Sequence, residues 1–440
     1  MTQSALRSPS EVFRFAQRYL PGGVCASARN NPAIGRPFFV SHGDGPYVFD
    51  LEGKKYIDLC ISHGASLLGH NHPKITEAIR SALEAGIICS YETVHHAALA
   101  QKISEVVPCA QMSRFAGSGT ETIMHGLRLA RAATGREKII KFEGHFHGYS
   151  DDIFISSAPP IDQAGLPSSP QPYLQSAGTP TQAKELVIIV PFNDPAALEK
   201  AFAKRGHEAA ALILEPINYD SGCILPQPGF IQLCRQLCDR YNVILFFDEV
   251  LTAFRVALGG AQELYGVTPD MCVLGKAIGA GMPISALAGK QEIMQNLRPQ
   301  GQSEMSGTYL AHLTAVLSAQ AAIDIYTQPN FYSQLEKLCG RFYSGFQTII
   351  DRSGVPLRLQ YAGPRFGLYF GIEEPVTNYR QAAKQNNAMS LKFISACIQR
   401  KVYIHVSPHH GFSAVHTESD LDNTLEAIEG ALAEVRKEFS

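Results

Sequence analysis

The sequence lacks any long apolar run and any block of charge of one sign. No apolar stretch reaches the length needed to cross a membrane, and the opening residues MTQSALRSPSEVFRFAQRYLPGG lack the continuous apolar stretch of a secretory signal. The 38 basic and 40 acidic residues leave a formal net charge of -2, with no basic segment and no acidic tail. Nucleic acid and membranes are therefore not expected as partners.

CxxC pairs, internal repeats and low-complexity segments are also missing. The ten cysteines are scattered, which in a chain of 440 residues favours free thiols in a reducing cytosol over a disulfide framework. We therefore expect a cytoplasmic protein. The length allows one large domain and a smaller one, and 45% hydrophobic with 18% charged residues is typical of a globular protein.

The middle of the chain alternates short apolar strands with helical stretches. This pattern predicts an α/β domain with a mostly parallel sheet, and the near-continuous apolar character suits strands covered on both faces. Helical stretches such as 228–241 lie between the candidate strands. The strands are expected at 138–144, 186–192, 210–216, 243–250 and 271–276.

The two ends of the chain do not continue the regular strand–helix alternation of the middle. Long helices are expected at 310–326 and 332–350, a strand at 365–373, and a closing amphipathic helix with Thr417 as its N-cap. Short strands are expected around 46–59. We predict a large domain at 66–325, with residues 1–65 and 326–440 forming a smaller α+β domain.

A candidate anion site lies in RFAGSGTETIMHGLRLARAATG (114–135). An apolar strand end meets Ser118, Gly119 and Thr120, and a helix begins there. Backbone N–H groups at such a helix start suit a phosphate group. The alternative is an ordinary Ser/Thr cap with glycine for the turn. The stretch matches neither a Walker loop nor the dinucleotide fingerprint.

The segment FEGHFHGYSDD (142–152) allows three interpretations. His145 and His147 with the following aspartates could bind zinc in a metallohydrolase, although the spacing fits loosely. Phe146 lies just past a strand end, where a flat cofactor ring could stack on it. Alternatively, Phe146 is a core residue.

Two charged residues end consecutive apolar strands. Asp248 closes VILFFDEV, and Lys276 follows MCVLG 28 residues later. A helix cap or salt bridge would explain Asp248 alone. However, the carboxyl ends of parallel strands gather at one sheet edge, so Asp248, Lys276 and the turn 118–120 are predicted to converge on one cleft.

Pyridoxal 5'-phosphate fits each part of this set. A lysine forms a Schiff base with it, a carboxylate keeps its pyridine nitrogen protonated, an aromatic ring stacks on it and a helix start holds its phosphate. Desolvation lowers the pKa of a lysine, and the neutral amine is the form that attacks an aldehyde. The half-buried position predicted for Lys276 therefore suits this chemistry.

These residues resemble the class III (ω-type) pyridoxal-phosphate aminotransferases. The stretch 248–289, DEVLTAFRVALGGAQELYGVTPDMCVLGKAIGAGMPISALAG, is very similar to the family signature. GSGTET, RLARAATGREKIIKFEGHFHG, ILEP and SGTYLAH match further blocks, and the similarity runs from PGGV to HTESDL. It is nearest to glutamate-1-semialdehyde 2,1-aminomutases and the aminotransferases grouped with them. The resemblance implies the fold type I architecture of pyridoxal-phosphate transferases.

The resemblance also implies roles around the cofactor ring. Lys276 would carry the Schiff base and then move protons as general base and acid. Asp248 would pair with the pyridine nitrogen, while Val250 and Phe146 would cover the ring faces. Asn218 lies where the family often has a glutamine near the ring hydroxyl.

The cofactor phosphate is expected to be held by two subunits. Ser118, Gly119 and Thr120 would bind it from one chain, and Thr308 of SGTY would reach it from the neighbouring subunit. The resemblance therefore implies a homodimer with active sites at the interface.

Substrate binding is expected from the two ends of the chain. PGGVCASAR parallels the aminomutase pattern whose arginine binds a carboxylate, which makes Arg29 the candidate, unless it is a surface or structural arginine. The sequence departs from that pattern at Ala26, and at His63 where aminomutases usually carry tryptophan. HVSPHHGFSAVHT lacks the expected glutamate and offers Ser407, His409 and His410 instead, of which His409 is the candidate substrate contact.

The leading hypothesis is a transaminase. A donor amine converts the cofactor to pyridoxamine 5'-phosphate, and a keto acid, ketone or aldehyde then takes the amino group. The alternative is a glutamate-1-semialdehyde 2,1-aminomutase, which transfers the amino group within one molecule. A metallohydrolase using His145 and His147 is a remote third hypothesis.

Overall fold

The computed structural model describes residues 8–439 and divides the chain into two compact units. The large unit comprises Pro73–Tyr332 together with Pro375–Ala383. The small unit comprises Ser333–Glu374 and the described parts of Met1–His72 and Lys384–Ser440. Both ends of the chain therefore contribute to the small unit.

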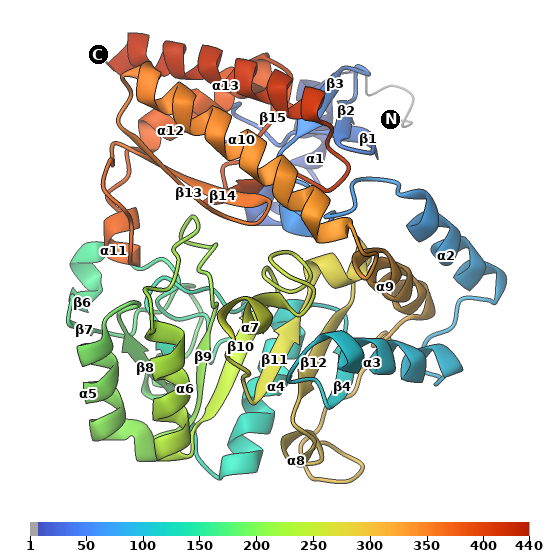
Figure 1. Ribbon diagram of the computed structural model, residues 1–440, viewed down its shortest axis with the longest axis vertical. Coiled ribbons are helices and arrows are strands. Elements are labelled where there is room, and N and C mark those ends of the chain that lie inside the picture. The colour runs from blue at the N-terminus through green and yellow to red at the C-terminus, as the bar shows by residue number, and fades with distance from the viewer. Residues whose placement is uncertain (1–7, 440) are drawn as a thin grey trace. The chain divides into compact units, whose positions relative to one another are not determined.

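A seven-stranded sheet in the order β4-β12-β11-β10-β9-β5-β8 forms the centre of the large unit (Figure 1). Strands β8, β5, β9, β10 and β11 run parallel to one another, whereas β12 is antiparallel to both of its neighbours. This mostly parallel mixed sheet confirms the predicted α/β class. The strands are β4 (Met112–Ala116), β5 (Lys138–Phe142), β8 (Val187–Val190), β9 (Ala209–Leu214), β10 (Ile244–Glu249), β11 (Met271–Leu274) and β12 (Ser285–Gly289), with a separate pair β6 (Gly165–Leu166) and β7 (Ser169–Pro170).

Helices pack against this sheet and explain its apolar strands. Every residue of β9 and β10 is buried, as expected for strands covered on both faces. Helix α4 packs on β4, β9, β11 and β12, while α5 and α6 pack on β8, β9 and β10. The helices of this unit are α2 (Pro73–Glu84), α3 (Val94–Val106), α4 (Gly119–Thr134), α5 (Pro195–Arg205), α6 (Phe230–Tyr241), α7 (Gly260–Tyr265), α8 (Gln291–Met294), α9 (Leu313–Tyr326) and α11 (Tyr379–Ala382).

The small unit contains two sheets, in the orders β1-β2-β3-β15 and β13-β14-β16. Its strands are β1 (Val40–Asp44), β2 (Tyr47–Asp50), β3 (Lys55–Asp58), β13 (Leu357–Ala362), β14 (Arg365–Phe370), β15 (Val402–Tyr403) and β16 (His409–Gly411). Its helices are α1 (Pro9–Ala16), α10 (Phe331–Ser353, whose first two residues belong to the large unit), α12 (Asn387–Gln399) and α13 (Glu418–Phe439). Thr417 caps α13 as predicted, because its Oγ1 accepts the Asp420 N–H at 3.1 Å.

None of the helices within residues 8–439 combines the length and apolar character that a membrane span requires.

Candidate active site

Asp248 and Lys276 lie at the carboxyl ends of two neighbouring parallel strands. Strand β10 pairs with β11 so that Asp248 is opposite Val273, and Lys276 follows three residues later. Asp248 is buried and Lys276 is half-buried. The backbone φ of Lys276 is +49°, in the left-handed region that non-glycine residues rarely adopt. Such backbone conformations cluster at functional sites, where the surrounding structure enforces them.

The side chain of Val250 connects these strand ends with the start of helix α4. A Cβ atom placed on Gly119 would lie 3.1 Å from one Val250 methyl carbon. A Cβ atom on Gly275, which precedes Lys276, would lie 3.1 Å from the other. The structure therefore brings three parts of the predicted site together around Val250. Gly119 of the turn Ser118–Thr120 approaches the Val250 side chain, as does Gly275, which precedes Lys276. Asp248 lies two residues before Val250 in the same chain segment.

The carboxyl group of Asp248 is held by two partners. His147 Nδ1 lies 2.8 Å from Oδ2, and the Val250 N–H donates to Oδ1 at 3.1 Å. Burial raises the pKa of Asp248 to about 7, and burial also lowers the pKa of His147 well below its usual value. Both shifts reflect the cost of charge in a dry site. A cation facing Asp248 would offset that cost.

The loop that carries Phe146 and His147 is held by hydrogen bonds to buried charged residues. The Phe146 N–H donates to Glu215 Oε1 at 3.0 Å, and the Glu215 N–H donates to His145 Nδ1 at 3.1 Å. The fully buried Lys141 donates from Nζ to the carbonyls of His145 at 2.8 Å and Ile155 at 2.6 Å. These contacts fix the loop in one conformation.

The same loop also approaches the start of helix α4. A Cβ atom on Gly148, whose φ is +90°, would lie 2.8 Å from Thr120 Cα, so only glycine fits there. Phe146 is half-buried and packs edge-on against Phe154, with ring centroids 5.9 Å apart. The stacking role of Phe146 stays a prediction.

Asn218 is fully buried, and both ends of its amide contact the protein. Its Nδ2 donates to the Gly144 carbonyl at 3.2 Å, and its Oδ1 accepts the Ser221 N–H at 2.8 Å. The Ser221 hydroxyl donates to the same Gly144 carbonyl at 2.8 Å. These contacts make Asn218 a link between two loops of the site.

Helix α9 supports the turn that begins with Lys276. The Ser318 hydroxyl donates to the Gly279 carbonyl at 2.8 Å, and the Tyr326 hydroxyl donates to the Ala277 carbonyl at 2.8 Å. Ser318 and Tyr326 are both buried. A short turn that follows a strand is thus fixed by a helix some 40 to 50 residues further along the chain.

The geometry does not support the metallohydrolase hypothesis. The rings of His145 and His147 are 5.9 Å apart, and the Nδ1 atom of each already has a protein partner. Within residues 8–439, no group of three histidine, cysteine or acidic side chains is arranged to hold a metal ion.

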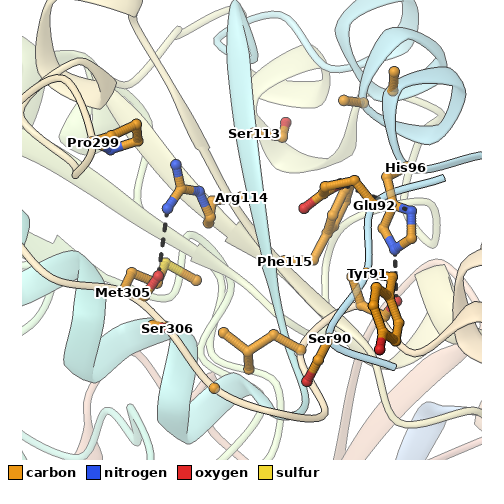
Figure 2. Close-up of a pocket in the computed structure, with 15 residues that line it drawn as sticks. Ser90, Tyr91, Glu92, His96, Ser113, Arg114, Phe115, Pro299, Met305 and Ser306 are labelled. Atoms are coloured by element: carbon orange, nitrogen blue, oxygen red, sulfur yellow. Dashed lines mark hydrogen bonds and ion pairs between the residues drawn. The ribbon is translucent and has the colours of Figure 1, made fainter. Parts of the chain in front are cut away.

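Thr308 lies beside a separate groove of the large unit, with a volume of about 570 Å³. Figure 2 shows Ser90, Tyr91 and His96 along one side of it and Met305 and Ser306 along another. His96 Nε2 lies 2.9 Å from the Ala311 carbonyl, and the Thr308 carbonyl accepts a hydrogen bond from Ser90 at 3.0 Å. Thr308 itself is exposed.

The three predicted substrate residues all belong to the small unit. Arg29 is exposed at the end of a short turn, Ser27–Arg29. His63 is half-buried with a φ of +52°. His409 is buried, and its ring and carbonyl accept from the guanidinium of Arg365.

Sequence reasoning missed several residues that build the site. The sequence suggests His147 only as a metal ligand, and it does not predict Glu215 or Lys141 as site residues. A signal existed for Glu215, because it follows an apolar strand just as Asp248 ends one. No signal distinguished Lys141, since a lysine inside a strand is usually a solvated residue.

Comparisons with known proteins identify the family of the chain. The family model described as aminotransferase class-III matches residues 27–405. The chain is similar to an omega-transaminase from Sphaerobacter thermophilus, with a TM-score of 0.91 and 28% identity over 97% of both chains. It is also similar to a β-phenylalanine aminotransferase from Variovorax paradoxus, with a TM-score of 0.84 and 25% identity over 97% of this chain and 93% of the other.

An aminomutase also shares the fold. A glutamate-1-semialdehyde-aminomutase from Pseudomonas aeruginosa PAO1 has a TM-score of 0.87 and 21% identity, over 97% of this chain and 94% of the other. The large unit offers what pyridoxal 5'-phosphate requires: a buried carboxyl, a lysine at a strand end and a helix start lined by glycine. The chain belongs to the class III aminotransferases, and it is a pyridoxal-phosphate-dependent transaminase.

Proposed function

We propose that the cofactor binds at the strand ends of the large unit and that amino groups pass there from a donor molecule to a separate carbonyl acceptor. The observation that carries this proposal is the position of Val250. Its two methyl groups lie so close to Gly119 and Gly275 that a Cβ atom at either glycine would be 3.1 Å away, which supports a common site for the helix start, Asp248 and Lys276. Each of these three parts has a distinct use toward the cofactor.

Lys276 would hold the cofactor covalently and then move protons. When bound, pyridoxal 5'-phosphate supplies an electron sink for the carbon that carries the amino group. The Lys276 amine, once released, would take a proton from that carbon as general base and later give a proton back as general acid. The hydrogen bonds of Ser318 and Tyr326 to this turn would limit the movement of the amine.

Asp248 would face the pyridine nitrogen with His147 behind it. The cation expected at that nitrogen would stabilise the Asp248 carboxylate, whose pKa is otherwise raised to about 7 by burial. The His147 contact at 2.8 Å keeps the carboxyl oriented. Val250 and Phe146 would then cover the two ring faces.

The phosphate group would bind at the start of helix α4. Ser118 caps this helix by accepting the Glu121 N–H at 3.2 Å, so the other N–H groups of the first turn and the Thr120 hydroxyl remain to bind an anion.

Asn218, whose amide joins Gly144 to Ser221, acts as a positioning residue for the loops of the site.

We propose that the protein is a homodimer whose second copy covers the groove near Thr308. Four large apolar side chains near that groove are strongly exposed: Ile87 (77%), Tyr91 (76%), Val94 (79%) and Tyr309 (73%). An apolar surface of this kind indicates a protein interface. Thr308 of one copy would then reach the phosphate bound by the other.

A cytoplasmic location is supported by the cysteines. All ten are free, nine of them buried or half-buried, which suits a reducing compartment.

Carboxylate-bearing amines are the proposed donors, with β-amino acids among them. Arg29 supplies an exposed guanidinium that can bind a carboxylate with two hydrogen bonds. The similarity to a β-phenylalanine aminotransferase supports β-amino acids as the first donors to try.

The Lys276→Ala variant tests this function. It should lose the visible absorbance of the lysine-bound cofactor and essentially all amino transfer to an added keto acid. Lys204→Ala, which removes an exposed lysine from helix α5, is the matched control and should keep both. Amino transfer at the wild-type rate by Lys276→Ala would contradict the proposal.

The aminomutase remains the second candidate because of the fold shared with such an enzyme. It predicts conversion of glutamate-1-semialdehyde to 5-aminolevulinate without a separate acceptor. The proposed transaminase requires an acceptor for each turnover. Incubation with glutamate-1-semialdehyde alone, followed by product analysis, separates the two.

A further inference from the structure

Three histidines from separate segments of the small unit lie close together. Strands β3 and β15 pair in parallel, with Ile57 opposite Val402, so the segments that follow them leave the sheet at one edge. These segments carry His63 and His405, whose ring centroids are 4.7 Å apart in an edge-on arrangement. The parallel pairing thus explains why residues more than 300 positions apart meet.

The turn that carries His63 has an unusual backbone. Ile61, Ser62 and His63 have φ values of +42°, +54° and +52°, so three consecutive non-glycine residues are left-handed. Each such residue costs roughly 1 kcal/mol, and a β-branched isoleucine is especially disfavoured. The Gly64 N–H donates to the Ile61 carbonyl at 2.9 Å and helps to hold the turn. Strain of this kind persists where the position of a side chain matters.

The third histidine, His410, comes from strand β16. It pairs with Phe366 of β14, and the neighbouring Gly411 N–H donates to the Leu59 carbonyl at 2.9 Å. This bond places β16 beside the strained turn. His410 is only 5% exposed, and its Nδ1 has no hydrogen-bond partner within residues 8–439. A buried nitrogen without a partner requires an explanation, and a ligand supplies one.

The charges around the cluster favour an anion. Burial, followed by the positive charge of Arg365, lowers the pKa of His410 to about 3, and burial also lowers the pKa of His405. Both imidazoles are therefore neutral at pH 7, and each can donate one N–H. Asp58 is the acidic group near His405, and it is already hydrogen-bonded to His70 at 2.8 Å and to the Cys60 N–H at 2.8 Å.

We propose that His63, His405 and His410 form a binding site in the small unit for a carboxylate group of the amino donor or acceptor. Two neutral N–H donors in the field of Arg365 suit a carboxylate better than a cation or an apolar group. The backbone of Ala28 lies beside His405, so Arg29 begins next to the cluster. This assignment rests on the proposed function and adds His405 and His410 to Arg29 and His63 as determinants of substrate class.

Calorimetric titration of the holoenzyme with simple carboxylates tests the site without turnover. The probes are acetate, succinate, glutarate and 3-phenylpropanoate, with 3-phenylpropanamide as the neutral counterpart. At least one carboxylate should bind, and the amide should bind at least tenfold more weakly. His410→Leu and His405→Leu should weaken carboxylate binding tenfold or more, whereas His410→Asn, which keeps a donor near the Nδ1 position, should recover part of it.

Two controls make the outcome decisive. The exposed His207→Leu should bind the carboxylate as the wild type does, and the absorbance of the bound cofactor should be unchanged in every variant. Failure of the wild type to bind any carboxylate, or equal binding by the leucine variants, would overturn the histidine site. Amino transfer and the Lys276→Ala result would be unaffected by that failure, so the proposed function is judged separately.

Discussion

The Nδ1 atom of His147 lies 2.8 Å from Oδ2 of Asp248, and both side chains are buried. Loss of this contact leaves a buried carboxyl without its main side-chain partner, which costs about 1.5–3 kcal/mol for a charged group. His147→Phe should therefore lower kcat/KM by about 10- to 100-fold. Stopped-flow measurement of the first half-reaction checks the rate.

A purely structural role for His147 predicts something different. In that case, the pH at which the absorbance of the bound cofactor titrates would be the same in His147→Phe and the wild type. We expect this pH to shift in His147→Phe and to return toward the wild-type value in His147→Asn, whose amide can donate to Asp248.

Gly275 and Val250 provide a steric test of the cofactor site. The backbone of Gly275 is extended, with φ -155° and ψ -170°, so alanine can adopt its conformation. The added Cβ would lie 3.1 Å from Val250, which is closer than ordinary contact. Gly275→Ala should therefore weaken cofactor binding about tenfold, and adding Val250→Ala should restore part of the loss. Equilibrium dialysis against the cofactor measures both, and additive effects of the two changes would exclude the predicted contact.

Tyr326 supports the lysine turn through one hydrogen bond. Tyr326→Phe leaves the buried Ala277 carbonyl without this donor, which costs about 1–3 kcal/mol. We expect a lower melting temperature and a reduced kcat with little change in KM. Tyr19→Phe, which alters an exposed tyrosine away from the proposed dimer surface, serves as the control. Equal thermal stability of Tyr326→Phe and the wild type would show that the bond contributes nothing.

His416 should make the small unit sensitive to acid. Burial lowers its pKa in the folded chain to about 4, so the unfolded chain binds more protons between pH 4 and 6.5. Stability therefore rises with pH across this window and is lost as the pH falls, by about 2 kcal/mol from His416 between pH 7 and 5.

Urea unfolding at several pH values measures this effect. His416→Gln cannot titrate, so its stability should depend less on pH even if it is lower at pH 7. An unchanged slope between pH 7 and 5 would contradict the assignment, and the exposed His207→Gln should leave the slope as it is.

Tyr91 tests the proposed dimer. A charge at this exposed position, as in Tyr91→Glu, should oppose association if a second copy covers the surface. Analytical ultracentrifugation should show monomer for Tyr91→Glu and dimer for the wild type, with cofactor binding weakened because Thr308 of the partner is lost. Tyr19→Glu, at another exposed tyrosine, should remain dimeric. A monomeric wild type that retains full activity would rule out a shared site.

Local patterns predicted most strands of the central sheet but not all of them. Strands β9 and β10 are rich in isoleucine, leucine and phenylalanine, and their apolar runs identify them. Strand β12 was missed because its residues SALAG have low strand propensity. It forms because β11 and β4 supply hydrogen-bonding partners on both sides. The direction of β12 likewise depends on its neighbours.

The sequence by itself determined two of the charged residues at the strand ends, because Asp248 and Lys276 each follow an apolar run. Their convergence also followed from parallel strands ending at one edge. Only the tertiary structure decided which buried groups pair with them. Contacts such as His147 with Asp248 and Tyr326 with Ala277 join residues about 50 to 100 positions apart, and burial then sets their protonation. Both the contacts and the protonation states depend on how the folded chain packs, and no local sequence pattern predicts that packing.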